Sequence, residues 1–301
     1  MTSRKPIAVA TDDSPQSQAA VLWAARRAEK AGLPLVLLHV VDDRWVAEPY
    51  PWFGVLEEAG DQLLKTAAGR IRGATPVPVT TRLLTGSVGG SLAKYSRKAS
   101  MLVIGSGSGH LGGTLADRAL QVAASAKVPV AVVGTQDLAG RSGVVVGIDG
   151  SAESTQAVAY AAAEADREGD ELTVVYAIRM PDPLTDAGLA PASLSDMISE
   201  EERVVLSEAV AGLEEDYPDL KVRRVLETEL DPVDALVQAA GRARMLVVGS
   251  RGRGGFKRLL LGSTAHGVLK HLPCPTIITA SSPAKTGPDH GSGTAWPRPT
   301  P

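Results

Sequence analysis

The sequence predicts an α/β protein made of two repeated, doubly wound domains, each with a five-stranded parallel sheet. Two observations carry this prediction. One segment occurs twice in the 301-residue chain, and within each copy short apolar runs alternate with longer helical patterns. The length alone is typical of about two domains, and alternating strands and helices favour a parallel sheet covered on both faces.

The duplication is visible as a gapless match near the start of each copy. The run from Ala8 to Val40 is identical at 11 of 33 positions to the run that begins 137 residues later. A second block, ASMLVIGS from Ala99, matches ARMLVVGS from Ala243 at an offset of 144, so the second copy holds seven extra residues in between. We place them in Pro181–Glu200, where Pro, Asp and Ser are typical of a loop.

The first elements of the second copy follow directly from the pattern. Val144–Ile148 is a short apolar run, as expected for a strand covered on both faces. The turn Asp149-Gly150-Ser151 follows, and Ser151 is placed to cap a helix that runs to about Glu168. Gly169 then ends this helix.

The first copy repeats these signals. Ser14 stands at the cap position and Pro15 at the first helical position, and Gly32 ends the helix. The rest of the second copy reads in the same alternating way. Further strands are expected at Leu172–Ile178, Lys221–Glu227, Met245–Gly249 and Thr276–Thr279, with helices over Ser199–Asp216 and after Asp231-Pro232. Sheets of this kind bind ligands at the carboxyl ends of their strands.

The chain divides into three segments. We expect one domain over residues 1–140, a second over 141–280, and a tail over 281–301. The tail is rich in Pro, Gly, Ser and Thr and has too little apolar surface to fold, so we expect it to be disordered.

The composition restricts the class of protein. A formal net charge of −3 argues against a nucleic-acid-binding protein. We expect no signal peptide and no membrane span, because no long apolar stretch is present. The single cysteine, Cys274, excludes an internal disulfide. Together these features favour a cytoplasmic protein without a membrane partner.

The stretch VVGSRGRGGFKRLLLGST, from Val247, raises the question of function. Gly249 and Gly252 follow a buried strand, and Gly262 and Ser263 open a helix nine residues later. Glycine permits positive φ and close backbone approach, successive amides can form an anion nest, and a helix N-terminus adds N–H groups and a positive dipole end. Four basic residues lie in the stretch, Arg251, Arg253, Lys257 and Arg258. From the spacing alone, a phosphate site and a plain glycine-rich loop remain equally open.

The strand–Asp-Gly-Ser opening and the Gly249-x2-Gly252-x9-Gly262-Ser263 spacing resemble the universal stress protein family, in its tandem, ATP-binding form. The resemblance covers residues 5–134 and 142–280 and implies an adenine nucleotide α-hydrolase-like fold. It implies that Asp149 lies near the ribose, the backbone at Ala177 near the adenine, and the glycine–serine loop around the phosphates with a Mg²⁺ ion. The ten candidate binding residues are Asp149, Gly150, Ser151, Ala177, Gly249, Arg251, Gly252, Gly262, Ser263 and Thr264. For Asp149, a turn residue that bonds its own backbone is the alternative.

The first copy departs from the motif. At the offset of 144, Ser108 stands opposite Gly252, Arg118 opposite Gly262 and Ala119 opposite Ser263. A second alignment, with Gly113-Thr114 as the closing pair, requires compensating gaps. We therefore expect a degenerate first site. His110 in this loop is read as an exposed side chain. The aromatic segment Arg44–Phe53 packs on its own domain, faces a partner or covers the degenerate site, and the sequence leaves these open.

Three functions remain open at this point. The first is an ATP-binding regulatory stress-response protein, which leaves room for slow ATP hydrolysis. The second is an enzyme, such as an ATPase or a nucleotidyl transferase, and the third is a nucleotide-free interaction module. No catalytic residue and no metal ligand is assigned, because no His-Asp or paired-carboxylate constellation accompanies the glycine loop. The resemblance further implies pairing of the last strands, Val130–Val133 and Thr276–Thr279, within the chain, and a homodimer of chains.

Overall fold

The computed structural model describes residues 4–43, 53–107, 115–178, 192–253 and 261–280. The side chains of residues 115–118 and 192–199 are not described. The predicted tail, most of the aromatic segment, Ser108, His110 and Gly113-Thr114 lie outside the described residues.

Ten strands form one continuous sheet. The first copy supplies β1 (Ile7–Ala10), β2 (Leu35–Val41), β3 (Val79–Thr85), β4 (Met101–Gly105) and β5 (Val130–Val133). The second copy supplies β6 (Val144–Ile148), β7 (Leu172–Ala177), β8 (Val222–Glu227), β9 (Met245–Gly249) and β10 (Thr276–Thr279). Their order is β3-β2-β1-β4-β5-β10-β9-β6-β7-β8, in which each half is a five-stranded parallel sheet of the same topology. The predicted fold class is confirmed.

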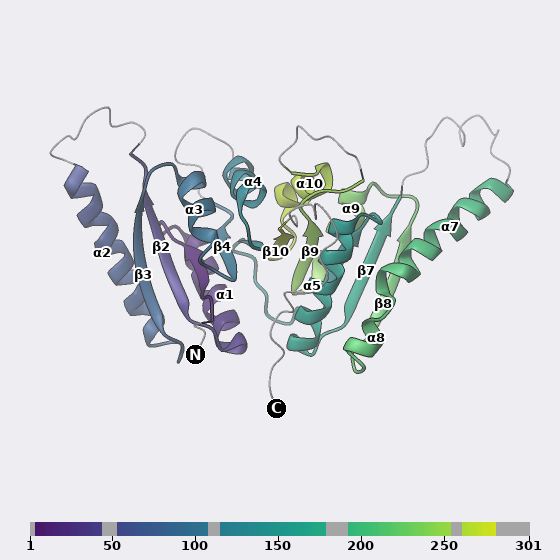
Figure 1. The fold of residues 1–301 in the computed structure, drawn as a ribbon, viewed down its shortest axis with the longest axis horizontal. Helices are drawn as coiled ribbons and strands as arrows, with labels where there is room; N and C mark the ends of the chain where they lie inside the picture. Colours follow the sequence, from purple (N-terminus) through teal and green to yellow (C-terminus); the bar gives the residue numbers. More distant parts are fainter. Residues whose placement is uncertain (1–3, 44–52, 108–114, 179–191, 254–260, 281–301) are drawn as a thin grey trace, which may run out of the picture.

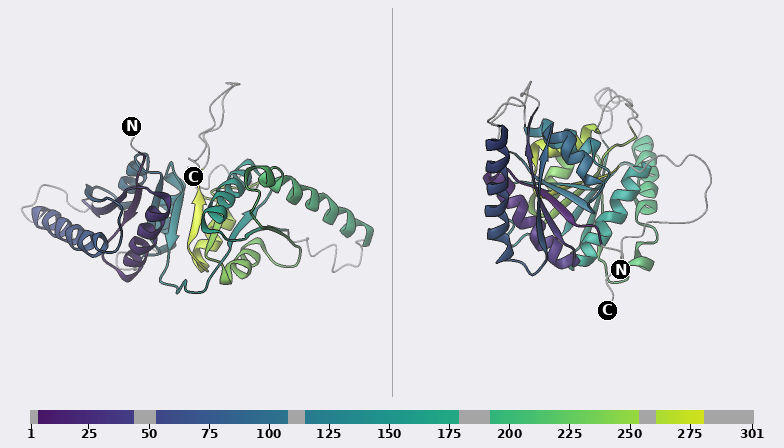
Figure 2. Two further views of the ribbon diagram at one scale, coloured as in Figure 1. Left: turned by 90° about the horizontal axis from the view of Figure 1, so that it is seen from below. Right: turned by 60° about the vertical axis from the view of Figure 1, so that its left-hand side comes forward.

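The two halves meet at the last strand of each copy. β5 and β10 pair antiparallel, with Ala131 opposite Ile277. Figure 1 shows the resulting arrangement, with α2 and α7 at the two outer ends and the β5–β10 seam in the middle, and Figure 2 shows β10, in yellow, beside the first copy. The seam therefore relates the two copies by an approximate two-fold axis.

Helices cover both faces of the sheet. They are α1 (Pro15–Ala31), α2 (Phe53–Arg72), α3 (Val88–Ser96), α4 (Leu115–Ser125), α5 (Ala152–Glu168), α7 (Ala192–Val210), α8 (Leu213–Asp216), α9 (Pro232–Ala239), the 3₁₀ turn η1 (Ala240–Arg242) and α10 (Ser263–His271). One core lies under α1, α2, α5 and α7, and a second lies under α3, α4, α9 and α10. Each core runs through both copies without interruption.

The helix predicted over Ser199–Asp216 is wrong as one element, because α7 ends at Val210 and α8 begins at Leu213, with Gly212 between them in the left-handed conformation (φ 81°). The predicted ends of α1 and α5 are confirmed. Ser14 and Ser151 cap α1 and α5, and each accepts a hydrogen bond from the N–H three residues later. Gly32 and Gly169 end these helices with φ of 60° and 67°.

The prediction of a loop over Pro181–Glu200 is wrong in its last part. Residues 192–200 were expected to be loop, but α7 begins at Ala192. From there to Val210 the chain contains neither Pro nor Gly, while Ala, Leu, Met and Glu favour a helix. The polar Ser and Asp residues of this stretch therefore do not break the helix. None of the helices in the described part of the chain combines the length and the apolar character needed to span a bilayer.

Candidate functional site

The first turn of the second copy lies between β6 and α5 and consists of Asp149, Gly150 and Ser151. Gly150 has a φ of 76°, in the left-handed region that glycine adopts without strain. The Ser151 N–H donates to Asp149 Oδ1 (3.0 Å), and Ser151 Oγ accepts from the Ser154 N–H (3.2 Å). Asp149 does bond its own turn, as the alternative interpretation expected, but this bond uses only one of its two oxygens.

The second oxygen of Asp149 faces the loop after β9. The Arg253 N–H donates to Asp149 Oδ2 (2.7 Å). Burial alone would raise the pKa of Asp149, but hydrogen bonds from Ser151 and Arg253 outweigh it, so this pKa lies below its ordinary value. The carboxylate is therefore ionised at neutral pH and holds the loop against the first turn.

Close packing, and not positive φ, explains the glycines of this loop. None of Gly249, Gly252 and Gly262 has a left-handed φ, so that part of the sequence argument is wrong. A Cβ on Gly252 would overlap Asp149 Oδ2, and one on Gly249 would stand 3.1 Å from the carbonyl oxygen of Arg251. On Gly262 the nearest atom would be 3.5 Å away, an ordinary contact. Of these three glycines, Gly252 is therefore the one at which a side chain would force the Asp149 carboxylate to move.

Arg253 makes contacts that the sequence did not indicate. A Cβ on Gly150 would overlap the Arg253 guanidinium, which therefore lies directly over the turn. Arg253 Nη1 donates to the hydroxyl of Tyr176 (3.3 Å). Burial and a hydrogen bond to Glu202 raise the pKa of Tyr176 to about 12. The neutral phenol thus joins β7 to this arginine and to α7.

The start of α10 forms the other side of the site. Gly262 occupies the N-cap position, and within the described residues no side chain caps the helix. The Gly262 N–H donates to the carbonyl oxygen of Ser250 (2.9 Å), which anchors the loop end beside β9. The N–H groups of the first helical turn, including those of Ser263 and Thr264, and the positive end of the helix dipole lie at this point.

These elements enclose a cavity of about 470 Å³. It lies at the carboxyl ends of β6, β7 and β9, where the strand order reverses around β6. Eight of the ten candidate residues line it: Asp149, Ala177, Gly249, Arg251, Gly252, Gly262, Ser263 and Thr264. Gly150 and Ser151 do not line it and shape the turn behind Asp149. The cavity therefore brings together residues that are more than 100 positions apart in the sequence.

The apolar wall of the cavity was missed by the sequence analysis. Its members come from three strands, from α9 and from the start of α10 with the residues just before it: Ile148, Val175, Pro232, Leu236, Val248, Leu261 and Ala265. They read as core positions in the sequence, since a buried strand end and a cavity wall have the same apolar composition. Only Gly147 gave a signal, because a glycine inside a strand marks a close approach; a Cβ there would stand 2.8 Å from Leu236 Cδ1.

The cavity has two chemically different ends. One is apolar, and the other carries the glycine loop, the α10 N-terminus, Asp149, Arg251 and Arg253. Among the described residues, no cluster of His, Cys, Asp or Glu could hold a metal ion. In the part of the chain that the structure describes, the polar end thus presents backbone amides, hydroxyl groups, two arginines and one carboxylate to a ligand.

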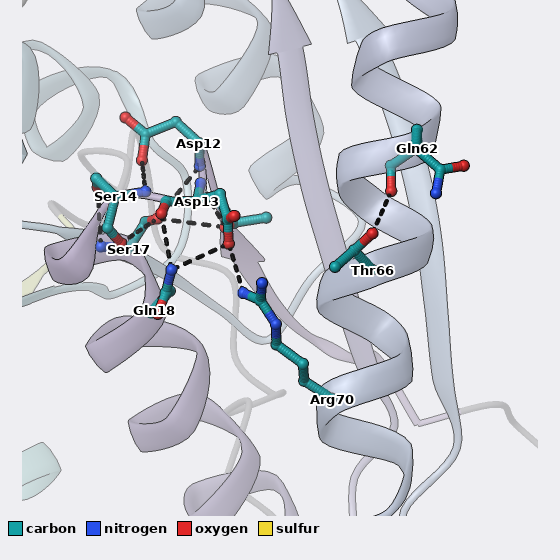
Figure 3. A network of polar contacts seen from close by, with 9 residues as sticks. Asp12, Asp13, Ser14, Ser17, Gln18, Gln62, Thr66 and Arg70 are labelled. Atoms are coloured by element: carbon teal, nitrogen blue, oxygen red, sulfur yellow. Dashed lines mark hydrogen bonds and ion pairs between the residues drawn. The ribbon is translucent and has the colours of Figure 1, made fainter.

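The first copy builds its corresponding turn differently (Figure 3). Asp13 takes the place of Gly150 and adopts the same left-handed conformation, with a φ of 61°. Its carboxylate accepts from Arg70 on α2 (2.7 Å) and from Gln18 on α1 (3.1 Å). Asp12 Oδ1 accepts from the Ser14 N–H (3.1 Å), as Asp149 does from Ser151. An arginine from a helix, instead of one from the loop after the fourth strand, thus reaches the turn in this copy.

The alignment that placed Arg118 opposite Gly262 is wrong. α4 begins at Leu115, so Arg118 and Ala119 lie inside this helix, whereas Gly262 precedes α10. The ends of the two helices, Ser125 and His271, are 146 residues apart, so the offset of 144 is not kept across this loop. The degenerate first site remains a prediction, since its loop lies outside the described residues.

Comparison with known proteins assigns the family. The profile of the Universal stress protein family matches residues 3–134 and 141–280. A universal stress protein of Mycobacterium tuberculosis is 34% identical over 291 residues, covering 92% of this chain and 97% of that protein. One from Mycolicibacterium smegmatis is 35% identical over 289 residues, covering 90% and 96%.

A solved structure agrees on the fold. The crystal structure of a universal stress protein from Archaeoglobus fulgidus matches with a TM-score of 0.66 and 18% identity, covering 92% of this chain and 97% of that one. Two profile matches in tandem, relatives of the same length and the shared architecture all agree. The chain belongs to the universal stress protein family of stress-response proteins, as a member with two tandem copies of the family domain.

Proposed function

We propose that this chain is an ATP-binding regulatory protein whose second copy holds the nucleotide. The observation that supports the proposal is the single cavity lined by eight of the ten residues chosen from the sequence. Its volume of about 470 Å³ is within the range of roughly 300–1,000 Å³ that is usual for small-molecule sites.

The two ends of the cavity suit the two ends of a nucleotide. The apolar wall of Val175, Leu236 and Val248 suits the faces of an adenine ring, with the backbone of Ala177 beside it. Asp149 is ionised and would accept hydrogen bonds from ribose hydroxyls. A carboxylate among phosphate-binding groups would be unfavourable, so we place the ribose, and not the phosphates, next to Asp149.

The phosphates would lie against main-chain N–H groups. The start of α10 supplies N–H groups and a positive dipole end without a competing side-chain cap. Arg251 and Arg253 both line the cavity and are exposed, so their charge is available to an anion. The Ser263 and Thr264 hydroxyls add further donors. This arrangement fits a chain of phosphates better than a single carboxylate.

Mg²⁺ would enter with the triphosphate. No described cluster of side chains could hold the ion by itself, and Mg²⁺ is commonly bound through substrate phosphates with few protein ligands. Its role there would be to neutralise phosphate charge.

A regulatory role is favoured over a catalytic one. Hydrolysis requires a base or a positioned water at the γ-phosphate, whereas Asp149, the one carboxylate among the described residues that line the cavity, is engaged by Ser151 and Arg253. A ligand that competes for Asp149 would break its bond to the Arg253 N–H and so reposition Arg253, and such a difference between states is what a switch needs. We further propose a cytoplasmic protein that assembles as a homodimer.

The test is direct measurement of nucleotide. Acid release from the purified protein followed by chromatography should yield an adenine nucleotide, and calorimetric titration of stripped protein should show one ATP site per chain. Gly241→Ala serves as the control for substitutions of the loop glycines. A Cβ at Gly241 meets no atom within 4 Å, and the residue lies outside the cavity.

Each alternative has its own outcome. Absence of binding in both assays would favour the nucleotide-free interaction module. Turnover faster than about 1 per second, which is within the usual range for enzymes, would favour the ATPase.

A further inference from the structure

The two copies touch each other through equivalent positions. α1 and α5 have 17 residues each, and Arg27 and Glu164 are the thirteenth residue of their respective helices. Arg27 Nη2 forms an ion pair with Glu164 Oε1. The strands at the junction, β5 and β10, also pair through equivalent positions. Ala131 lies opposite Ile277, and each is the second residue of its strand. Equivalent positions that contact each other lie on the approximate two-fold axis.

The charges on this axis are buried. The side chains of Arg27 and Glu164 are 6% and 1% exposed. Arg27 also donates to the hydroxyl of Tyr160 (3.1 Å), and Arg167 forms a second ion pair with Glu164 (2.6 Å). Buried charges are tolerated when they are paired and hydrogen-bonded, and are costly otherwise.

A second ion pair, with the same arrangement of charges, lies about one turn further along the two helices. Lys30 on α1 forms an ion pair with Glu168 on α5. α1 therefore contributes Arg27 and Lys30 to this interface, whereas α5 contributes Glu164 and Glu168 together with Arg167. In a pair of two first copies, Arg27 would face a second Arg27 without the carboxylates of α5, so like charges would be buried in contact. In a pair of two second copies, Glu164 would face a second Glu164, with Arg167 beside each carboxylate.

We propose that the Arg27–Glu164 pair decides which copies join at this interface. A first copy accepts a second copy, from its own chain or from another chain, and rejects another first copy. Two chains can then share this interface only by exchanging copies, so that each first copy pairs with the other chain's second copy. The inference concerns the domain interface and does not depend on nucleotide binding.

Charge reversal in the full chain tests the pairing rule. Arg27→Glu places two carboxylates on the axis, and Glu164→Arg places two guanidinium groups there. Each single variant should unfold at a lower temperature than the wild type, by more than about 5 °C, as expected for a change of a few kcal/mol. The double reversal should recover at least half of the loss. Two losses that simply add in the double variant would overturn the proposal.

A mixture of the two single variants gives a sharper test. Arg27→Glu chains carry acidic groups on both sides, and Glu164→Arg chains carry basic groups on both sides, so only the mixed pair offers matching faces. We would refold the two variants together with different affinity tags and measure co-capture. Mixed pairs should exceed same-variant pairs by at least tenfold, a difference that about 1.4 kcal/mol produces. Equal capture of mixed and same-variant pairs would overturn the proposal.

A neutral variant separates selectivity from stability. Arg27→Met with Glu164→Leu and Arg167→Met removes all three charges of the cluster, and such replacements are often neutral or stabilising. We expect this variant to unfold at the wild-type temperature or above. If it unfolds as early as Arg27→Glu, the loss of an ion pair and not the clash of like charges explains the reversals, and the proposed selectivity is wrong.

Discussion

The backbone N–H of Arg253 donates to the carboxylate of Asp149 over 2.7 Å, although the two residues are 104 positions apart. This bond joins the turn after the first strand of the second copy to the loop after its fourth strand. Both ends of the bond line the same cavity. The shape of the candidate site therefore depends on one ionised carboxylate.

Asp149→Asn should weaken ATP binding by about ten- to a hundredfold, because a bond to a charged group contributes about 1.5–3 kcal/mol. The amide can still accept from Ser151, but its nitrogen cannot accept from Arg253. Calorimetric titration measures the change. Asp12→Asn in the first copy is the matched control and should leave the dissociation constant unchanged. Equal weakening by both variants would contradict the assignment of the nucleotide to the second copy.

Gly252→Ala should weaken binding more than tenfold, whereas Gly262→Ala should change it by less than about threefold, corresponding to under 1 kcal/mol. The methyl group at Gly252 would displace the Asp149 carboxylate, while at Gly262 it makes only ordinary contacts. Binding titrations of both variants, with circular dichroism to check the fold, measure the difference. The reverse order of effects would show that the loop closes on its ligand in another way.

Glu164→Gln should destabilise the protein at neutral pH and much less in acid. Burial by itself would raise the pKa of Glu164, but Arg27 and Arg167 hold it below the ordinary value of 4.5. A group with a depressed folded pKa stabilises above its unfolded pKa, and this contribution is lost as the pH falls through the folded pKa. We expect a loss of about 3–5 kcal/mol at pH 7, as for other buried pairs deprived of one partner.

Urea unfolding at pH 7 and below pH 4.5 measures the effect of Glu164→Gln. The control is Glu171→Gln, whose pair with Arg223 is exposed on both sides and should contribute less than about 1 kcal/mol. A loss at pH 7 that stays constant far below pH 4.5 would show that the charge of Glu164 is not its cause.

Gly169→Ala should destabilise the second copy by about 1–2 kcal/mol, because an L-residue is strained in the left-handed conformation. The φ of Gly169 is 67°, and no atom lies within 4 Å of a Cβ built there, so the effect is conformational and not steric. Equilibrium unfolding compares it with Gly241→Ala, which has the same open surroundings without the left-handed φ. Equal effects of the two variants would remove the conformational explanation.

Local signals in the sequence predicted most of the fold. The apolar runs matched the strands within one residue, because a strand covered on both faces has little room for polar side chains. Ser151 and Gly169 marked the ends of α5, since capping and left-handed residues act within a few positions. Where signals competed, as in residues 192–200, the polar composition was misleading and the helix prevailed.

The site was predictable in part for the same reason. Gly252 and Asp149 could be selected because their positions match the motif that resembles the universal stress protein family, whereas their residue types alone are also typical of ordinary turns. The contact between them could not be derived from spacing, and neither could the position of Arg253 over Gly150. The role of Leu236 in the cavity wall could not be predicted either, because the sequence does not distinguish an apolar residue that lines a cavity from one that fills a core.

The antiparallel junction of β5 and β10 has a consequence for solubility in concentrated solution. Two separate sheets would have four unpaired margins, each a template for an incoming strand, and the joined sheet has two. The remaining margins are β3, with the exposed Arg82, and β8, with the exposed Arg223 and Arg224. Positive charge at both margins opposes the addition of another chain, and the junction of the two copies removes two further margins at which such addition could begin.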